Sequence, residues 1–186
     1  MVVVVKKRRI IAGILLAIAA LILVFQIKPI LRRIYPMPHY EIVEQKSAKY
    51  QVDHYLIYAM MKAESSFETT AQSYVGAKGL MQVMDDTAAW AAEKIGIDPF
   101  EPNMIYDPEI NIEIGCWYIA RLLADNNGEL VNAVAAYNAG EGNVRQWQEE
   151  LGKNVLDIAD IPFPDTQKYV TKVLGYYENY QKIYQQ

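Results

Sequence analysis

A glutamate at the end of an apolar helical stripe is the residue of this chain best suited to chemistry. Ile57, Met60, Met61 and Glu64 follow the i, i+3, i+4, i+7 spacing that places side chains on one face of an α-helix. An ionised carboxylate is poorly solvated in such a position, so we expect its pKa to be raised. A carboxylic acid that keeps its proton near neutral pH can serve as a general acid. The alternative from this helix alone is a solvated or capping glutamate.

A loop with paired glycines, residues 73–82, is the second pattern. Gly76 and Gly79 allow the backbone to turn tightly and to approach a ligand. Met81 offers an apolar contact, and the Gln82 amide offers both a donor and an acceptor. The loop lacks the Gly-Lys-Ser/Thr ending of a phosphate-binding loop. Taken alone, it also fits a plain turn.

The third pattern is the sequence Ala-Tyr-Asn-Ala-Gly over residues 136–140. A glycine suffices to end a helix, so Tyr137 and Asn138 are not needed for that purpose. A tyrosine presents a flat apolar face and a hydroxyl, which suits a sugar ring. The alternative is that Tyr137 is simply a core residue.

Helices with recognisable ends must position these three motifs. Asp53 can cap the helix that carries Glu64, Asp85 or Asp86 can cap a later one, and Asp165 or Thr166 can cap the last. Alternating apolar runs are scarce, so the predicted class is all-α, and a short β-hairpin is compatible with residues 68–84. Besides the helix after Asp53 and the last helix, the pattern predicts helices over residues 41–50, 87–95, 108–126, 130–138 and 143–150.

Together the three motifs resemble lytic transglycosylases of the soluble type, whose catalytic domain is lysozyme-like and related to goose-type lysozyme. Glu64-Ser65, the Gly-x-x-Gly-Leu-Met-Gln run ending at Gln82, and the Ala-Tyr-Asn-Ala-Gly run occur in the family's order and spacing. The resemblance extends from about residue 41 to residue 182 and includes Asp165-Thr-x-x-Tyr169-Val. One departure is Glu68-Thr69, where the family usually has Asn-Pro.

The resemblance implies a peptidoglycan-cleaving enzyme that needs no metal and no cofactor. Glu64 would be the only catalytic acid and base, and the product would carry a 1,6-anhydro-N-acetylmuramic acid end. A hydrolytic muramidase on the same fold and a non-catalytic cell-wall-binding protein are the alternatives. The resemblance implies a substrate-binding set made of Ser65, Ser73, Gly79, Met81, Gln82, Tyr137, Asn138 and Tyr169.

The N-terminal segment has the composition of a membrane anchor. Four basic residues, 6–9, precede the uncharged run 10–27, which as a helix would span about 27 Å against a hydrocarbon core of about 30 Å. No small-x-small cleavage site follows the run, so an uncleaved single-pass anchor with the domain on the outer side is favoured over a signal peptide. The predicted division is a basic tail 1–9, an anchor 10–27, a linker 28–40 and a catalytic domain 41–186.

The charge distribution excludes one class of partner. Residues 1–33 hold 7 of the 18 Lys and Arg and no acidic residue, which leaves 11 positive and 22 negative side chains, a formal net charge of −11, on the remainder. So acidic a domain has no electrostatic footprint for nucleic acid.

Cys116 is the only cysteine and is predicted to be a buried structural thiol. His39 and His54 form no metal-ligand spacing.

Overall fold

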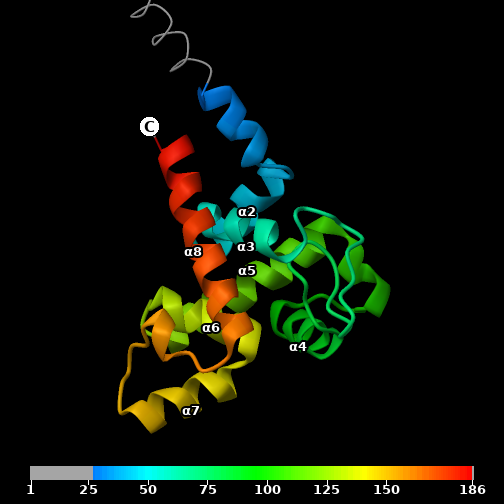
Figure 1. Cartoon of the computed structure of the whole chain (residues 1–186). Helices are drawn as coiled ribbons and strands as arrows, with labels where there is room; N and C mark the ends of the chain where they lie inside the picture. Colours follow the sequence, from blue (N-terminus) through cyan, green and yellow to red (C-terminus); the bar gives the residue numbers. More distant parts are fainter. Residues whose placement is uncertain (1–26, 186) are drawn as a thin grey trace, which may run out of the picture. The chain divides into compact units, whose positions relative to one another are not determined.

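The computed structural model describes residues 27–185, drawn in colour in Figure 1. The described residues divide into two compact units, one of residues 37–181 and one of residues 27–36 with residues 182–185. Within residues 27–185, no helix combines the length and the apolar character needed to cross a membrane. The predicted anchor, residues 10–27, lies outside the described residues apart from its last residue.

The helix α5 (Pro108–Asp125) is the centre of the larger unit (Figure 1). It starts where Asp107 accepts hydrogen bonds from the backbone N–H groups of Glu109 (2.8 Å) and Ile110 (3.3 Å), with Pro108 in the first turn. Its buried side includes the Cys116 thiol, as predicted. It packs against α2 (Tyr40–Tyr50), α4 (Asp85–Ile95), α6 (Leu130–Ala139) and the 3₁₀ helix η1 (Pro102–Tyr106).

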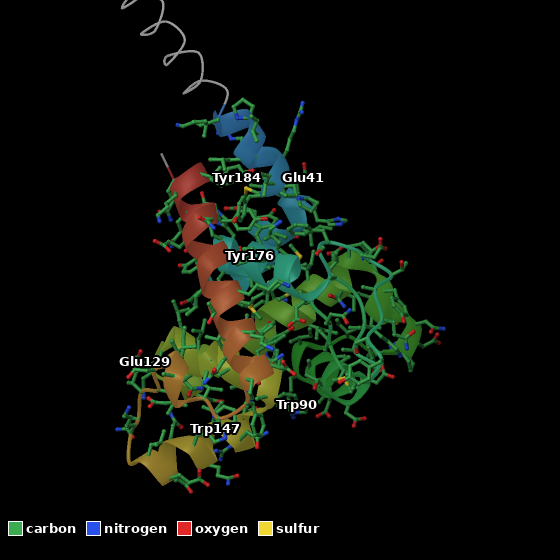
Figure 2. All side chains as sticks on the ribbon, in the orientation of Figure 1. Glu41, Trp90, Glu129, Trp147, Tyr176 and Tyr184 are labelled. Carbon is green, nitrogen blue, oxygen red and sulfur yellow. The ribbon has the colours of Figure 1, made fainter. Side chains whose placement is uncertain are left out.

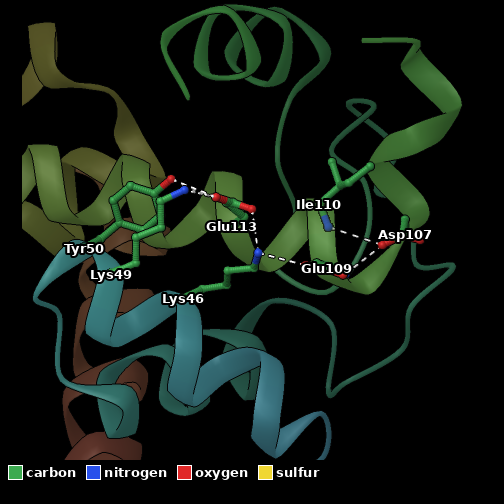
Figure 3. Close-up of polar contacts among 7 residues, drawn as sticks. All are labelled: Lys46, Lys49, Tyr50, Asp107, Glu109, Ile110 and Glu113. Atoms are coloured by element: carbon green, nitrogen blue, oxygen red, sulfur yellow. Dashed lines mark hydrogen bonds and ion pairs between the residues drawn. The ribbon is translucent and has the colours of Figure 1, made fainter. Parts of the chain in front are cut away.

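Ion pairs fix α2 against α5 (Figure 3). The Nζ atom of Lys46 lies 2.9 Å from a carboxylate oxygen of Glu109 and 2.8 Å from one of Glu113. Glu113 also accepts from Lys49 at 2.5 Å and from the Tyr50 hydroxyl at 3.1 Å. Lys46 is only 7% exposed, so its charge needs both carboxylates as partners.

The helix α3 (His54–Glu64) and the long helix α8 (Pro164–Tyr184) meet through tyrosine side chains. Asp53 caps α3 as predicted, accepting from the backbone N–H of Tyr55 at 2.8 Å. The Tyr177 hydroxyl donates to Asp53 (2.7 Å), and the Tyr169 hydroxyl donates to Glu64 (2.5 Å). The two helices are therefore antiparallel, and the contact at the end of α3 reaches the candidate acid.

The loop between α3 and α4 contains no strand within residues 65–84. Two isolated antiparallel bridges join Lys78 to Gln72 and to Val83, which is less than the short hairpin considered from the sequence. The class predicted from the sequence, all-α, is confirmed for the described residues, including α7 (Glu141–Leu151) and the short η2 (Ile158–Asp160).

Two predicted helix caps are wrong because both helices begin earlier than expected, which places the predicted residues inside the first turn. The helix α4 begins at Asp85 with Met84 at the cap position, and Asp85 binds Lys78 Nζ at 2.8 Å with both oxygens. The helix α8 begins at Pro164, and Thr166 inside its first turn donates at 2.8 Å to the Oδ1 atom of Asn138. That second bond ties α8 to the end of α6.

Candidate active site

Glu64 is the last residue of α3, and part of its surface remains accessible. The residues that precede it on the same face, Ile57, Met60 and Met61, are fully buried. Its carboxylate therefore has an apolar helix behind it. Burial raises the pKa of Glu64 to about 7. At neutral pH the side chain is divided between its acid form and its carboxylate, as a group that must both give and take a proton requires.

Two groups of α8 oppose the effect of burial. The Tyr169 hydroxyl donates a 2.5 Å hydrogen bond to Glu64 Oε1, and this bond favours the ionised form and lowers the pKa of Glu64. The ammonium of Lys172, which donates to the carbonyl of Ala63 at 3.0 Å, lowers that pKa further through its charge. No carboxylate within residues 27–185 is among the groups that shift the Glu64 pKa.

Tyr137 completes the cluster around Glu64. Its hydroxyl donates to the backbone carbonyl of Met81 at 2.8 Å. Burial, and then the charge of Glu64, raise the pKa of Tyr137 well above its ordinary value, and the same two causes act on Tyr169. Both phenols therefore stay protonated and remain hydrogen-bond donors. The structure brings together three residues predicted from separate motifs.

Asn111 was not singled out from the sequence, yet it holds the glycine loop in place. This fully buried side chain accepts from the backbone N–H of Met81 (2.8 Å) and donates to the carbonyls of Ile105 (2.8 Å) and Lys78 (3.1 Å). Gly79 has a φ of +76°, and a Cβ there would lie 2.2 Å from Asn111 Nδ2. The signal in the sequence was a lone asparagine within the apolar stretch of α5.

Met81 and Gln82 take different positions. The Met81 side chain is 0% exposed and lies against Gly115, where a Cβ would come within 2.2 Å of the Met81 sulfur. The Met81 side chain therefore holds the loop against α5. This position differs from the expected one, in which the side chain would line the cleft and contact the substrate. Gln82 is partly exposed, and its amide donates to the carbonyls of Ala71 (3.1 Å) and Gly79 (2.9 Å).

The two predicted serines make their hydrogen bonds within the fold. Ser65 donates to the carbonyl of Leu80 at 2.8 Å, which joins the end of α3 to the glycine loop. The Ser73 hydroxyl accepts from the backbone N–H of Ala77 at 2.9 Å and so closes its own turn. None of the hydrogen bonds of Ser73 within residues 27–185 reaches Glu64. Their roles toward a substrate stay predictions.

A cavity of about 240 Å³ adjoins this cluster. Tyr118 stands beside Tyr137 in its wall, with ring centroids 5.3 Å apart. Trp90 meets Tyr118 edge to face at 6.3 Å, so the aromatic surface continues beyond the cavity. Polar and aromatic surface of this kind fits a sugar. The lining consists of Gln82, Val83, Met84, Thr87, Tyr118, Tyr137, Asn138, Ala139 and Gly140.

Comparisons with known proteins agree on one family. The family described as "Transglycosylase SLT domain" matches residues 41–155. The chain is 31% identical over 146 residues to the soluble lytic murein transglycosylase of Escherichia coli strain K12, covering 76% of this chain and 23% of that protein. It is 31% identical over 164 residues to membrane-bound lytic murein transglycosylase C of Yersinia pestis, covering 76% of this chain and 46% of that protein.

Solved structures show the same likeness. An inactive variant of the lytic transglycosylase Slt of Pseudomonas aeruginosa superposes with a TM-score of 0.74 at 34% identity, covering 82% of this chain and 25% of that one. A 70 kDa soluble lytic transglycosylase in complex with bulgecin A gives a TM-score of 0.77 at 30% identity, with the same coverages. The chain thus spans about a quarter of the length of the soluble relatives it matches.

Proposed function

We propose, from the premise that the chain belongs to the transglycosylase SLT domain family, that it is a peptidoglycan lytic transglycosylase. The substrate bond is the β-1,4 link between N-acetylmuramic acid and N-acetylglucosamine. The observation that carries the proposal is Glu64 at the end of α3, with a pKa near 7 and a hydrogen bond from Tyr169.

Glu64 acts first as an acid. Its proton passes to the glycosidic oxygen, and the bond from C1 of N-acetylmuramic acid to that oxygen breaks, which frees the 4-hydroxyl of the next sugar. The oxygen of the substrate's own acetamido group attacks C1 and forms an oxazolinium ring. Ordinary glycosidases use a second carboxylate in this step. The absence of a carboxylate among the groups that shift the Glu64 pKa, within the described residues, supports a substrate-supplied nucleophile.

Glu64 then acts as a base. Its carboxylate takes the proton of the C6 hydroxyl, whose oxygen bonds to C1 as the oxazolinium ring opens. The 1,6-anhydro end forms, Glu64 regains its proton, and no water is consumed. Proton transfer by a positioned group contributes about 10²–10⁴-fold. The donated bond from Tyr169 keeps the carboxylate oriented between the two steps.

Loop residues supply the walls in this proposal. Gln82, Tyr137 and Asn138 line the cavity and would contact the sugars. Gly79 and Met81 contribute through their contacts with Asn111. The Asn111 side chain accepts from the backbone N–H of Met81, and Tyr137 donates to the carbonyl of the same residue.

Hydrolysis by a muramidase is the alternative chemistry, and a non-catalytic wall-binding protein is the alternative class. Digestion of purified peptidoglycan distinguishes all three. Anhydro ends weigh about 18 mass units less than the reducing ends that a hydrolase leaves, because the products differ by one water. Binding without any product would identify a wall-binding protein.

We further propose that residues 10–27 anchor the chain in the bacterial cell membrane, with residues 41–186 on the cell-wall side. The uncharged run behind four basic residues supports this arrangement, and a relative is named membrane-bound. Carbonate washing of isolated membranes tests it, since an integral anchor stays in the pellet. Release of the full chain into the wash would contradict the anchor.

A further inference from the structure

A second cavity, of about 420 Å³, lies among α5, α6 and α7, outside the Glu64 cluster. Its size is within the range of about 300–1,000 Å³ that is usual for ligand pockets. The lining side chains are mostly charged or amide-bearing, which distinguishes this cavity from the aromatic one. They include Arg121, Asp125, Asn126, Glu141, Arg145 and Gln148.

The charges of this cavity are ordered rather than scattered. The Arg121 guanidinium donates to both carboxylate oxygens of Glu141, at 2.5 and 2.9 Å, and lies 3.1 Å from Asp125. It also lies over the ring of Trp90, with 4.9 Å from Cζ to the ring centroid. Arg121 is thus held on several sides, and its charge is compensated by two carboxylates.

Arg145 differs from Arg121 in having no ion-pair partner among residues 27–185. Its positive charge helps to lower the pKa of Glu141, after the larger effect of the hydrogen bond from Arg121. Arg145 nevertheless forms no ion pair within the described part of the chain, and it is exposed on α7. A guanidinium presents a planar set of donors that matches a carboxylate.

The charged cavity adjoins the aromatic one at Tyr118. Tyr118 lines the aromatic cavity, and Glu141 and Arg121 of the charged cavity are close enough to act on its pKa, which burial raises. Trp90, labelled in Figure 2, contacts both Tyr118 and Arg121. Ring contacts therefore connect Tyr137 through Tyr118 and Trp90 to Arg121 of the charged cavity.

We infer that this charged cavity receives the peptide stem of the glycan strand, with Arg145 binding a stem carboxylate. The inference rests on the proposed function, which places the sugars beside Tyr137 and Tyr118. In stem-bearing strands the sugars carry no formal charge, because the lactyl carboxyl of N-acetylmuramic acid is bonded to the stem as an amide. A charged cavity next to a sugar cleft therefore fits a different part of the substrate. The stem, attached to N-acetylmuramic acid, carries free carboxylates, and an uncompensated guanidinium is the group that recognises them.

The test compares glycan strands that carry unmodified stems with strands whose stem carboxylates have been converted to amides, because removing the stems would expose the lactyl carboxylate of each N-acetylmuramic acid. We expect Arg145→Ala to lower kcat/KM about tenfold on strands with unmodified stems, the value of one charge-assisted hydrogen bond, and to leave kcat/KM on the amidated strands unchanged. Arg145→Lys should recover part of the loss. Lys94→Ala, which removes an exposed positive charge that pairs with Glu93 at 3.2 Å, is the matched control. An equal loss on both substrates, or no loss, would overturn the inference.

A binding experiment keeps the inference separate from the enzyme activity. Synthetic stem tetrapeptides, with diaminopimelate or lysine at the third position, are titrated into the full-length protein while Trp90 and Arg145 are followed by NMR. Saturable binding that Arg145→Ala weakens about tenfold would support the cavity even if the wild-type protein cleaved no strand. Such a failure of cleavage would count against the proposed function alone. Absence of tetrapeptide binding would count against the cavity.

Discussion

The hydroxyl of Tyr169 donates a 2.5 Å hydrogen bond to Oε1 of Glu64, a residue 105 positions earlier in the chain. The bond connects the end of α3 to the first half of α8. It favours the ionised carboxylate, whereas burial favours the acid, and the balance leaves the Glu64 pKa at about 7. The pH dependence of catalysis should therefore respond to changes on α8 that leave Glu64 itself intact.

Replacing Tyr169 tests that balance. In Tyr169→Phe the donor is gone, so the carboxylate loses a stabilising bond and the Glu64 pKa rises above its value in the wild-type protein. Because Glu64 must be protonated to act as an acid, the alkaline limb of the pH–rate profile should move to higher pH. The maximal rate should fall about three- to tenfold as the orientation of Glu64 loosens. A profile of kcat/KM from pH 5 to 9 measures both effects, and an alkaline limb that moved down would contradict them.

Lys172 should act in the same direction through its charge alone. Lys172→Met removes a cation that lowers the Glu64 pKa, so the alkaline limb should again move to higher pH. The effect should shrink at high ionic strength, because Lys172 is exposed and its charge is screened. Lys168→Met is the matched control, since Lys168 lies one turn away and pairs with Asp165 at 3.1 Å. Equal shifts in the two variants would refute a specific effect of Lys172.

Stability should report the buried carboxylate independently of catalysis. The folded-state pKa of Glu64 is about 7, against an ordinary value of 4.5, so the folded protein binds more protons than the unfolded chain between these two pH values. The free energy of unfolding should therefore fall as pH rises from about 4.5 to 7. In Glu64→Gln this loss is absent, and the variant should be more stable than wild type by about 1–3 kcal/mol at pH 8.

Urea denaturation of wild type and Glu64→Gln at pH 4.5, 6 and 8 gives the comparison. The difference between the two should be near zero at pH 4.5 and should grow toward pH 8. A constant difference at all three values would show that the carboxylate is not responsible.

Gly79 should be among the least replaceable glycines. Its positive φ, and the 2.2 Å that would separate an alanine Cβ from the Asn111 amide, predict that Gly79→Ala costs about 2–5 kcal/mol of folding free energy. Gly142, a helical glycine of α7 with no atom within 4 Å of its Cβ position, is the control and should be neutral or slightly stabilised by alanine. Chemical denaturation of the two variants measures the change in the free energy of unfolding. Similar changes at both positions would contradict the role given to Asn111 in the loop.

The sequence allowed the helices to be predicted well because their ends carry local signals. Asp53 and Pro108 start helices where expected, since a cap depends only on residues within one turn. Asp85 and Thr166 are not caps because their helices begin at Asp85 and Pro164, and their side chains bind Lys78, seven residues earlier, and Asn138. Local propensity could not anticipate those partners.

The candidate site also has features that the local sequence predicts and features that depend on how the helices pack. The amphipathic spacing around Glu64 predicted a raised pKa, because burial on a helix face follows from periodicity. The distance to Tyr169 depended on how α3 and α8 pack, and only the family resemblance indicated it. Asn111 and Lys172 were missed, since a buried amide and an exposed lysine acquire their roles from backbone carbonyls brought close by the fold.

The products of peptidoglycan digestion test the central claim most directly. Wild-type protein should release fragments with 1,6-anhydro-N-acetylmuramic acid ends, about 18 mass units below the hydrolysed form, and Glu64→Gln should lower the rate by at least about 10²-fold while remaining folded by circular dichroism. Mass spectrometry of the two digests decides. Reducing ends from the wild-type protein, or anhydro ends released at an undiminished rate by Glu64→Gln, would contradict the assignment of Glu64 as the acid and base.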